Sequence, residues 1–378
     1  MMPRHCRRHP RCLSLLALMF VNLTALFGHA AAKIEVNYEL ADAGFEVFNP
    51  ELPRAERELA LQNYLNHPLM QVAFERYSNP RRSEENRVTN ELYIDFVKKV
   101  WQEDFEAITH PRMRLILEHY KWGLANLEEV ESDLTLIKAQ MPSWLEAVQR
   151  KIPWDTPAVR RDDTPIQIIF LFDPGGSFPW VTEREGIRYI FINILQVRGL
   201  TDEERQDPID PPVFLGLLVH ELFHLYQPGG EGGQGFAGWL VKAAVNEGSA
   251  CLIGNNAPNS SGQKLSEHEP IYFPPTLKDE WLSQIENSPQ RIQDLQALVE
   301  EWRESPPETN EARARLTKDN WVASPLNGLF MGDLYRVGAE MLLDIKLHLG
   351  LDEFYEVIGD PGKLIETWKK TRARPDSM

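Results

Sequence analysis

Apolar positions recur at helical spacing along the first half of the chain. Residues 54–77, 83–105, 111–128 and 131–151 each carry apolar side chains three and four positions apart, which indicates helices with one buried face. Asn79-Pro80 ends the first of these segments, because proline cannot continue a helix. We expect the aromatic side chains on these faces in the core: Tyr93, Phe96, Trp101, Tyr120, Trp122 and Trp144. This pattern predicts a helical N-terminal lobe.

The pattern changes after residues 153–165, a segment rich in proline and charge that we interpret as a domain boundary. The apolar stretches 166–172 and 187–194 are typical of strands, with a turn at Asp173-Pro174-Gly175-Gly176 between them. Two interpretations fit the pair. It is a plain hairpin that supports the next helix, or a sheet edge that pairs with an extended peptide.

Helical periodicity returns in residues 210–227, 236–253, 277–304 and 329–349. In the first of these, Asp210 suits the N-cap, Pro211 suits the first turn and Pro228 stops the helix. The prediction is therefore a mainly α protein with a small β-sheet (α+β). We expect a helical lobe over residues 33–160 and a catalytic region with a helical C-terminal subdomain over residues 161–378.

The first 32 residues resemble an export signal. Four arginines precede a mostly apolar stretch of residues 13–27, and small side chains follow at Ala30 and Ala32. A membrane anchor is the alternative, but the stretch is shorter than the ~20 residues that a span needs. After cleavage only Cys251 remains, so no internal disulfide is expected. We predict an exported protein of a bacterial periplasm or exterior, with no stable membrane span.

The net charge of −16 argues against nucleic acid as a partner. Glycine is frequent in residues 228–235, but this segment lacks a basic residue, so it does not match a loop that binds nucleotide phosphates. We expect a mobile connection there, and a lid over the cleft is one role that it could have. The sequence carries no signal for an oligomeric state.

The pentad His220-Glu221-Leu222-Phe223-His224 is the HExxH pattern of zinc hydrolases. Histidines four apart on a helix share one face, so both imidazoles can reach one ion. Glu221 between them can hold a water bound to that ion and act as its general base. The alternative is a chance match in a helical scaffold, which predicts no stoichiometric metal.

The third zinc ligand predicted is Glu247, which lies 23 residues after the second histidine. It is embedded in a stripe of small and apolar side chains, where a lone carboxylate is destabilising unless it meets a cation. An ordinary solvated glutamate is the alternative for this position. Cys251, one turn later, is a ligand in principle but is more typical of a core residue.

These motifs resemble the gluzincin group of zinc metallopeptidases, the thermolysin-like clan. HELFHLYQ at 220–227 and NEGSA at 246–250 carry the resemblance, which extends over residues 166–350. It implies a zincin-like core between helical lobes, zinc, a peptide or protein substrate, and a helical subdomain that closes the cleft. By the same similarity, Tyr335 is the candidate that donates to the oxyanion; a tyrosine that only packs between helices is the alternative. The spacing between ligands is slightly longer here, and the glycine-rich insertion accounts for the difference.

The predicted reaction is hydrolysis of a peptide bond, with Glu221 as general base on zinc-bound water. A peptidase, an aminopeptidase and an amidase share this ligand set. The alternative from another class is a non-catalytic exported protein that keeps the metal site for structure or ligand binding. His268 is a weak candidate for a substrate contact, against an ordinary surface histidine.

Overall fold

The computed structural model describes residues 33–80, 84–175, 179–198, 209–228, 235–262, 264, 287–318 and 333–373. Over these residues the protein is mostly helical with one small sheet, which confirms the predicted fold class. The predicted export signal, residues 229–234 of the glycine-rich segment and His268 lie outside the described residues. No helix within the described ranges is long and apolar enough to cross a membrane.

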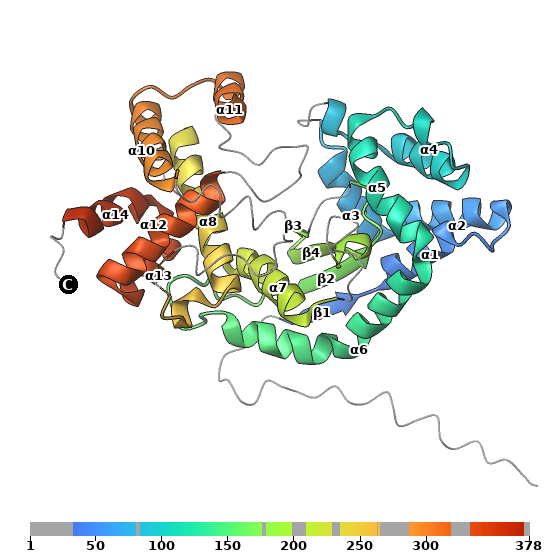
Figure 1. Ribbon diagram of the computed structural model, residues 1–378, viewed down its shortest axis with the longest axis horizontal. Helices are drawn as coiled ribbons and strands as arrows, with labels where there is room; N and C mark the ends of the chain where they lie inside the picture. The colour runs from blue at the N-terminus through green and yellow to red at the C-terminus, as the bar shows by residue number, and fades with distance from the viewer. Residues whose placement is uncertain are drawn as a thin grey trace, which may run out of the picture.

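A four-stranded sheet lies at the centre of the molecule (Figure 1). Strands β1, β2 and β4 are parallel, and β3 runs antiparallel to β4 at one edge. β2 and β4 are mostly apolar and are buried on both faces, as parallel strands usually are. In spatial order the strands are β1 (Ile34–Asn37), β2 (Ile166–Leu171), β4 (Ile187–Asn193) and β3 (Trp180–Arg184).

The predicted hairpin of residues 166–172 with 187–194 is wrong. The two strands are parallel, with Ile166 opposite Arg188. The hairpin is instead formed by β3 and β4, whose connection is Glu185 and Gly186, both with positive φ (53° and 73°). Two such residues are typical of a tight hairpin turn whose twist matches that of the strands. β3 and β1 were not predicted, because both strands are short and half-exposed.

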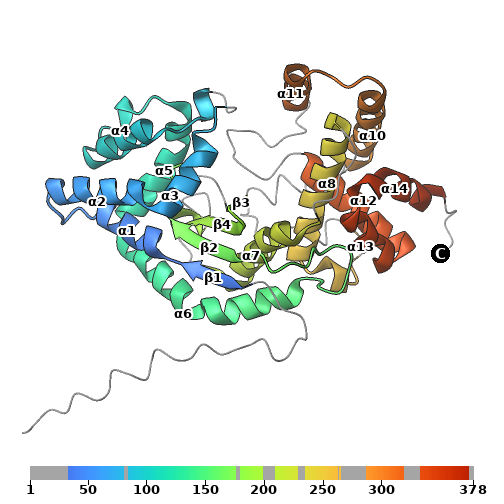
Figure 2. The same ribbon diagram turned by 180° about the vertical axis from the view of Figure 1, so that it is seen from behind.

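The helices of the N-terminal half surround one end of the sheet (Figures 1 and 2). The single helix predicted for residues 54–77 is wrong: it is interrupted at His67, because Pro68 restricts the residue before it to an extended conformation. Tyr93, Phe96, Tyr120 and Trp144 are buried, as predicted. The helices are α1 (Glu39–Phe48), α2 (Arg54–Asn66), α3 (Pro68–Tyr77), α4 (Asn90–Trp101), α5 (Pro111–Ala125) and α6 (Leu127–Lys151).

The helices of the C-terminal half begin with α7, which packs against the sheet and against α8. α12 in turn packs along α8. In both views α7 and α8 lie between the sheet and the remaining C-terminal helices (Figures 1 and 2). The helices are α7 (Pro211–Tyr226), α8 (Gly235–Gly254), α10 (Ser288–Glu304), α11 (Thr309–Lys318), α12 (Asp333–Leu349), α13 (Leu351–Gly359) and α14 (Leu364–Ala373).

A buried carboxylate connects the N-terminal helix α3 to the sheet. Asp173, just after β2, is fully buried. Its Oδ2 accepts hydrogen bonds from the Tyr77 hydroxyl on α3 at 2.9 Å and from the Trp180 indole on β3 at 3.1 Å. Its Oδ1 accepts the N–H of Gly175 at 2.7 Å. Asp173 therefore joins α3 to the sheet against which α7 packs.

Candidate metal centre

Helix α7 carries both histidines of the pentad on one face. It begins at Pro211, and Asp210 occupies the predicted N-cap position, although its side chain makes no capping hydrogen bond. Most of the helix is buried because its side chains are apolar on nearly every face. His220 is 2% exposed and the His224 side chain 12% exposed. Their Nε2 atoms lie 3.0 Å apart.

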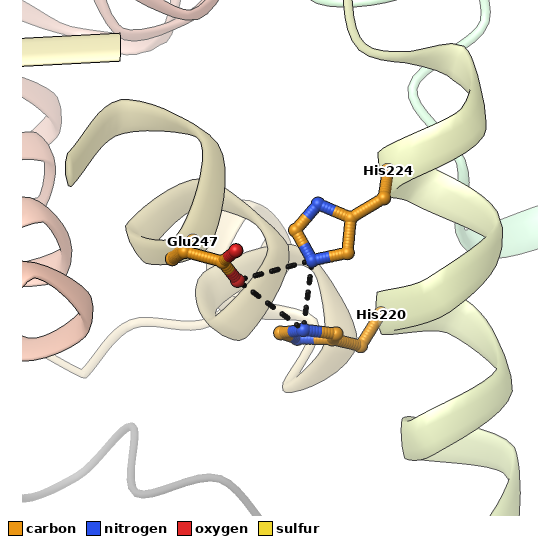
Figure 3. Close-up of side chains that lie close together, drawn as sticks. All are labelled: His220, His224 and Glu247. Carbon is orange, nitrogen blue, oxygen red and sulfur yellow. Dashed lines mark hydrogen bonds and ion pairs between the residues drawn. The ribbon is translucent and has the colours of Figure 1, made fainter. Parts of the chain in front are cut away.

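Glu247 meets these rings from the neighbouring helix α8 (Figure 3). Its Oε2 atom lies 3.1 Å from Nε2 of His224 and 3.8 Å from Nε2 of His220. The three ligand atoms all lie within 4.8 Å of one another. Zinc–ligand bonds of ~2.0–2.1 Å at tetrahedral angles place ligand atoms roughly 3.3 Å apart. The separations therefore have the size that a common ion requires.

The hydrogen bonds around the cluster also fit a metal. His224 Nδ1 lies 3.0 Å from the side-chain oxygen of Gln227, and His220 is hydrogen-bonded to the main chain of Ala250. With the other ring nitrogen engaged, each Nε2 of a neutral imidazole points an electron pair at the cluster. Among the described residues, no hydrogen-bond partner is found for the buried Oε2 atom of Glu247. Two imidazole nitrogens and one carboxylate oxygen that converge in this way are a typical ligand set for a zinc ion.

Charges within the cluster shift the pKa values of the two histidines in opposite directions. Burial lowers the pKa of His220 well below its usual value, and the charge of His224 lowers it further. Burial also lowers the pKa of His224, but the Glu247 carboxylate outweighs burial, and the net result is a pKa of about 9. The two imidazoles therefore differ in how strongly the neighbouring carboxylate favours their charged form.

Glu221 follows His220 on α7 and is 4% exposed. Burial raises the pKa of its carboxyl group to about 8, although the positive charges of His224 and Arg76 lower it. Glu247 raises it as well, through repulsion between two carboxylates. A carboxyl group with this pKa can take up or release a proton near neutral pH.

Tyr335 reaches the cluster from α12. Its hydroxyl is hydrogen-bonded to the Glu247 side chain, and burial raises the pKa of the phenol well above its usual value. The structure thus brings together all five residues singled out in the sequence, His220, Glu221, His224, Glu247 and Tyr335. Their roles stay predictions.

Close packing of α8 against α12 makes this contact possible. A Cβ atom added to Gly338 would lie 1.8 Å from the carbonyl oxygen of Ala244, and one added to Gly248 would lie 2.3 Å from the N atom of Ala339. Both distances are shorter than any contact between such atoms. Glycine at these two positions lets the backbones approach, so that a tyrosine on one helix touches a glutamate on the other.

Two further residues near the cluster are Cys251, which was considered as a ligand, and Gln227, whose contact with His224 was not predicted. Cys251 is buried and does not belong to the metal-ligand cluster found among the described residues, in keeping with its interpretation as a core residue. Gln227 was noted only as part of a motif, yet it contacts His224. The signal that could have identified it is a polar residue three positions after a ligand on a buried helix.

Residues 61–373 match the family described as "Putative zinc dependent peptidase (DUF5700)". The chain belongs to this family. The description of the family names the metal that the donor set of His220, His224 and Glu247 suits. The match begins within α2 and ends at the last residue of α14, so both helical lobes are part of it. No curated protein and no solved structure shows significant similarity to the chain.

Proposed function

We propose that this protein is a zinc-dependent metallopeptidase of the gluzincin type, with His220, His224 and Glu247 as the ligands of the ion. The observation that carries the proposal is the convergence of two imidazole nitrogens and a carboxylate oxygen within 4.8 Å. The family description supports the same class of reaction. Two histidines and one glutamate leave a coordination position for a reactant, as catalytic zinc sites do.

Zinc supplies Lewis-acid chemistry at such a site, where it polarises a carbonyl group and makes water more acidic. In the proposed reaction the Glu221 carboxylate accepts a proton from the attacking water and delivers it to the leaving amine nitrogen. Its burial supports this role, because a pKa of about 8 suits both steps at neutral pH. Its position directly after His220 supports it as well.

Tyr335 is proposed to donate its hydroxyl proton in a hydrogen bond to the oxygen on which negative charge develops. A preorganised donor of this kind typically stabilises the transition state by ~3 kcal/mol. The bond to Glu247 supports the proposal, because it holds the phenol beside the ligand cluster. When substrate binds, the hydroxyl would exchange a carboxylate acceptor for the developing oxyanion.

We propose that the peptide substrate lies along β3. Among the described strands, β3 pairs only with β4, so its other edge can receive an extended chain by strand addition. The Arg76 guanidinium lies 4.4 Å from the ring centroid of Trp180, the first residue of β3, and the same charge acts on Glu221. The beginning of this strand and the proposed base therefore lie in one neighbourhood, which supports a substrate that contacts both.

The proposal includes export, for which the sequence of residues 1–32 is the support. The site would then act on peptides or proteins in a bacterial periplasm or exterior. The net charge of −16 supports a substrate other than nucleic acid.

The substitution Glu221→Gln tests the proposal. We expect the variant to bind one zinc ion per chain and to lose at least about 100-fold in kcat for peptide hydrolysis, because general-base catalysis contributes roughly this much. Zinc content is measured by elemental analysis and cleavage with a peptide library. The matched control is Glu340→Gln, the same change at a half-buried glutamate on α12.

Two outcomes would contradict the proposal. If E221Q cleaves peptides as fast as the wild type, Glu221 is not the base. If the zinc-loaded wild type cleaves no member of the library while it holds one zinc ion, the non-catalytic metal-binding protein becomes the better assignment.

A further inference from the structure

Gln227 is a buried amide at the end of the metal-binding helix. It follows Tyr226, the last residue of α7, and its main-chain N–H donates to the carbonyl of Phe223 at 2.9 Å. The residue is 8% exposed. A primary amide has two N–H donors and one acceptor oxygen, and a buried one must find partners for them within the protein.

The Gln227 side chain connects α7 to α8. Its Nε2 donates to the main-chain carbonyl of Asn246 at 2.6 Å and to the Ser249 hydroxyl at 2.9 Å. Ser249 is fully buried and donates its own proton to the same Asn246 carbonyl at 3.1 Å. Since Asn246 directly precedes Glu247, these bonds hold α8 at the turn that carries the third predicted ligand.

These partners fix the orientation of the amide. A main-chain carbonyl only accepts hydrogen bonds, so Gln227 must present its NH2 group to Asn246. The amide oxygen is then the atom that faces His224 Nδ1 at 3.0 Å. An amide oxygen also only accepts, so Nδ1 must carry a hydrogen.

The consequence for His224 follows from this orientation. In a neutral imidazole with hydrogen on Nδ1, the free electron pair belongs to Nε2. That atom faces Glu247 Oε2 at 3.1 Å and His220 Nε2 at 3.0 Å. The Gln227 amide therefore determines which nitrogen of His224 is free to bind a metal, and it is also hydrogen-bonded to the helix that carries Glu247.

We propose that Gln227 is a positioning residue of the metal site, which sets the tautomer and ring orientation of His224 and its separation from Glu247. The inference rests on the metal ion of the proposed function, but it does not depend on peptide hydrolysis. Partners of this kind typically change metal affinity by 10–100-fold.

The two histidines differ in what supports them. His220 is held by the main chain of Ala250, a group that any residue at position 250 supplies. His224 is held by the side chain of Gln227. A substitution can therefore remove the support of His224 alone, which makes the inference accessible to experiment.

The experiment compares three variants of the full chain. Gln227→Met removes the amide at nearly constant volume, and Gln227→Asn keeps it on a side chain one methylene shorter, which cannot reach both His224 and Asn246. The matched control is Gln196→Met, because Gln196 is also buried, at 6% exposure, and lies just after β4. The zinc dissociation constant is measured by competition with a chelator, and the cobalt-loaded proteins are compared by visible absorption.

We expect Q227M and Q227N to bind zinc about 10–100-fold more weakly than the wild type and to shift the cobalt absorption bands. Q196M should leave the zinc dissociation constant and the cobalt absorption bands unchanged, even if it changes the melting temperature. The inference is overturned if Q227M and Q227N bind zinc within twofold of the wild type, or if Q196M weakens binding equally. Should Q227M not fold, Q227N alone decides. A wild type that binds no zinc would refute the metal site itself, while failure to cleave peptides would refute only the reaction.

Discussion

The Tyr335 hydroxyl is hydrogen-bonded to the carboxylate of Glu247. The contact joins α12 to the predicted ligand on α8, although the two residues lie far apart in the sequence. A tyrosine in this position can act in two ways. It can orient Glu247, or it can donate to an oxyanion of the substrate once substrate is bound.

Tyr335→Phe separates the two roles. We expect kcat to fall by about 100-fold, equivalent to ~3 kcal/mol, with KM and zinc content nearly unchanged, because the lost donor acts on the transition state. Steady-state kinetics at saturating zinc measure this. Tyr226→Phe is the control, since that hydroxyl is buried without a hydrogen-bond partner among the described residues. A variant that loses zinc affinity but keeps kcat when fully loaded would assign Tyr335 to orienting Glu247.

Zinc removal should lower the thermal stability of the protein. A ligand that binds only the folded state stabilises it by mass action, by about 4 kcal/mol at a thousand times its dissociation constant. We expect chelation to lower Tm and added zinc to restore it. Glu247→Gln should abolish this response, because a neutral amide is a much poorer ligand, whereas Glu340→Gln should keep it. An undiminished response in E247Q would remove Glu247 from the ligand set.

The close approach of α8 and α12 can be tested with Gly338→Ala. The new methyl group would overlap the carbonyl oxygen of Ala244, so the helices must move apart. We expect a loss of about 1–3 kcal/mol or more, seen as a lower Tm. Gly123→Ala is the control: its methyl group would meet the end of the Leu195 side chain, which can rotate away. Equal stability of the two variants would contradict this packing argument.

The buried carboxyl group of Asp173 makes stability depend on pH. Burial raises the pKa of Asp173, although hydrogen bonds from Trp180, Gly175 and Tyr77 favour the charged form. With the folded pKa above the unfolded value of ~3.9, the folded state holds more proton in this interval, so stability falls as pH rises.

Asp173→Asn does not titrate and provides the reference. We expect the unfolding free energy of the wild type, relative to D173N, to decrease from about pH 4 upward until the folded pKa is passed. Denaturation series at several pH values measure it. A difference that grows with pH would mean that the hydrogen bonds outweigh burial.

Most helices and the candidate metal ligands could be predicted from local sequence pattern. A pentad on one helical turn specifies its own geometry, and Glu247 stood out as an acid within an apolar stripe. These signals depend on neighbours a few positions apart. Tyr335 was proposed only by similarity, because its contact with Glu247 depends on how two distant helices pack.

The strand pairing could not be derived in the same way. β2 and β4 have the composition of buried strands, but their parallel alignment depends on β3 and β1, which are short and half-exposed. Pro68 alone was sufficient to predict the break at His67, because the residue before a proline is disfavoured in a helix. The role of Gln227 required knowledge of which atoms of α8 lie opposite it.

β1 pairs with a strand far along the chain, so the sheet can form only after that strand has been synthesised. Ile34 is among the first described residues, yet its partner Ile166 is made about 130 residues later. A chain that emerges N-terminus first must leave this strand without a neighbour until β2 has appeared. Contacts at such separation slow folding, so β1 would stay unpaired in a nascent chain until the middle third had followed.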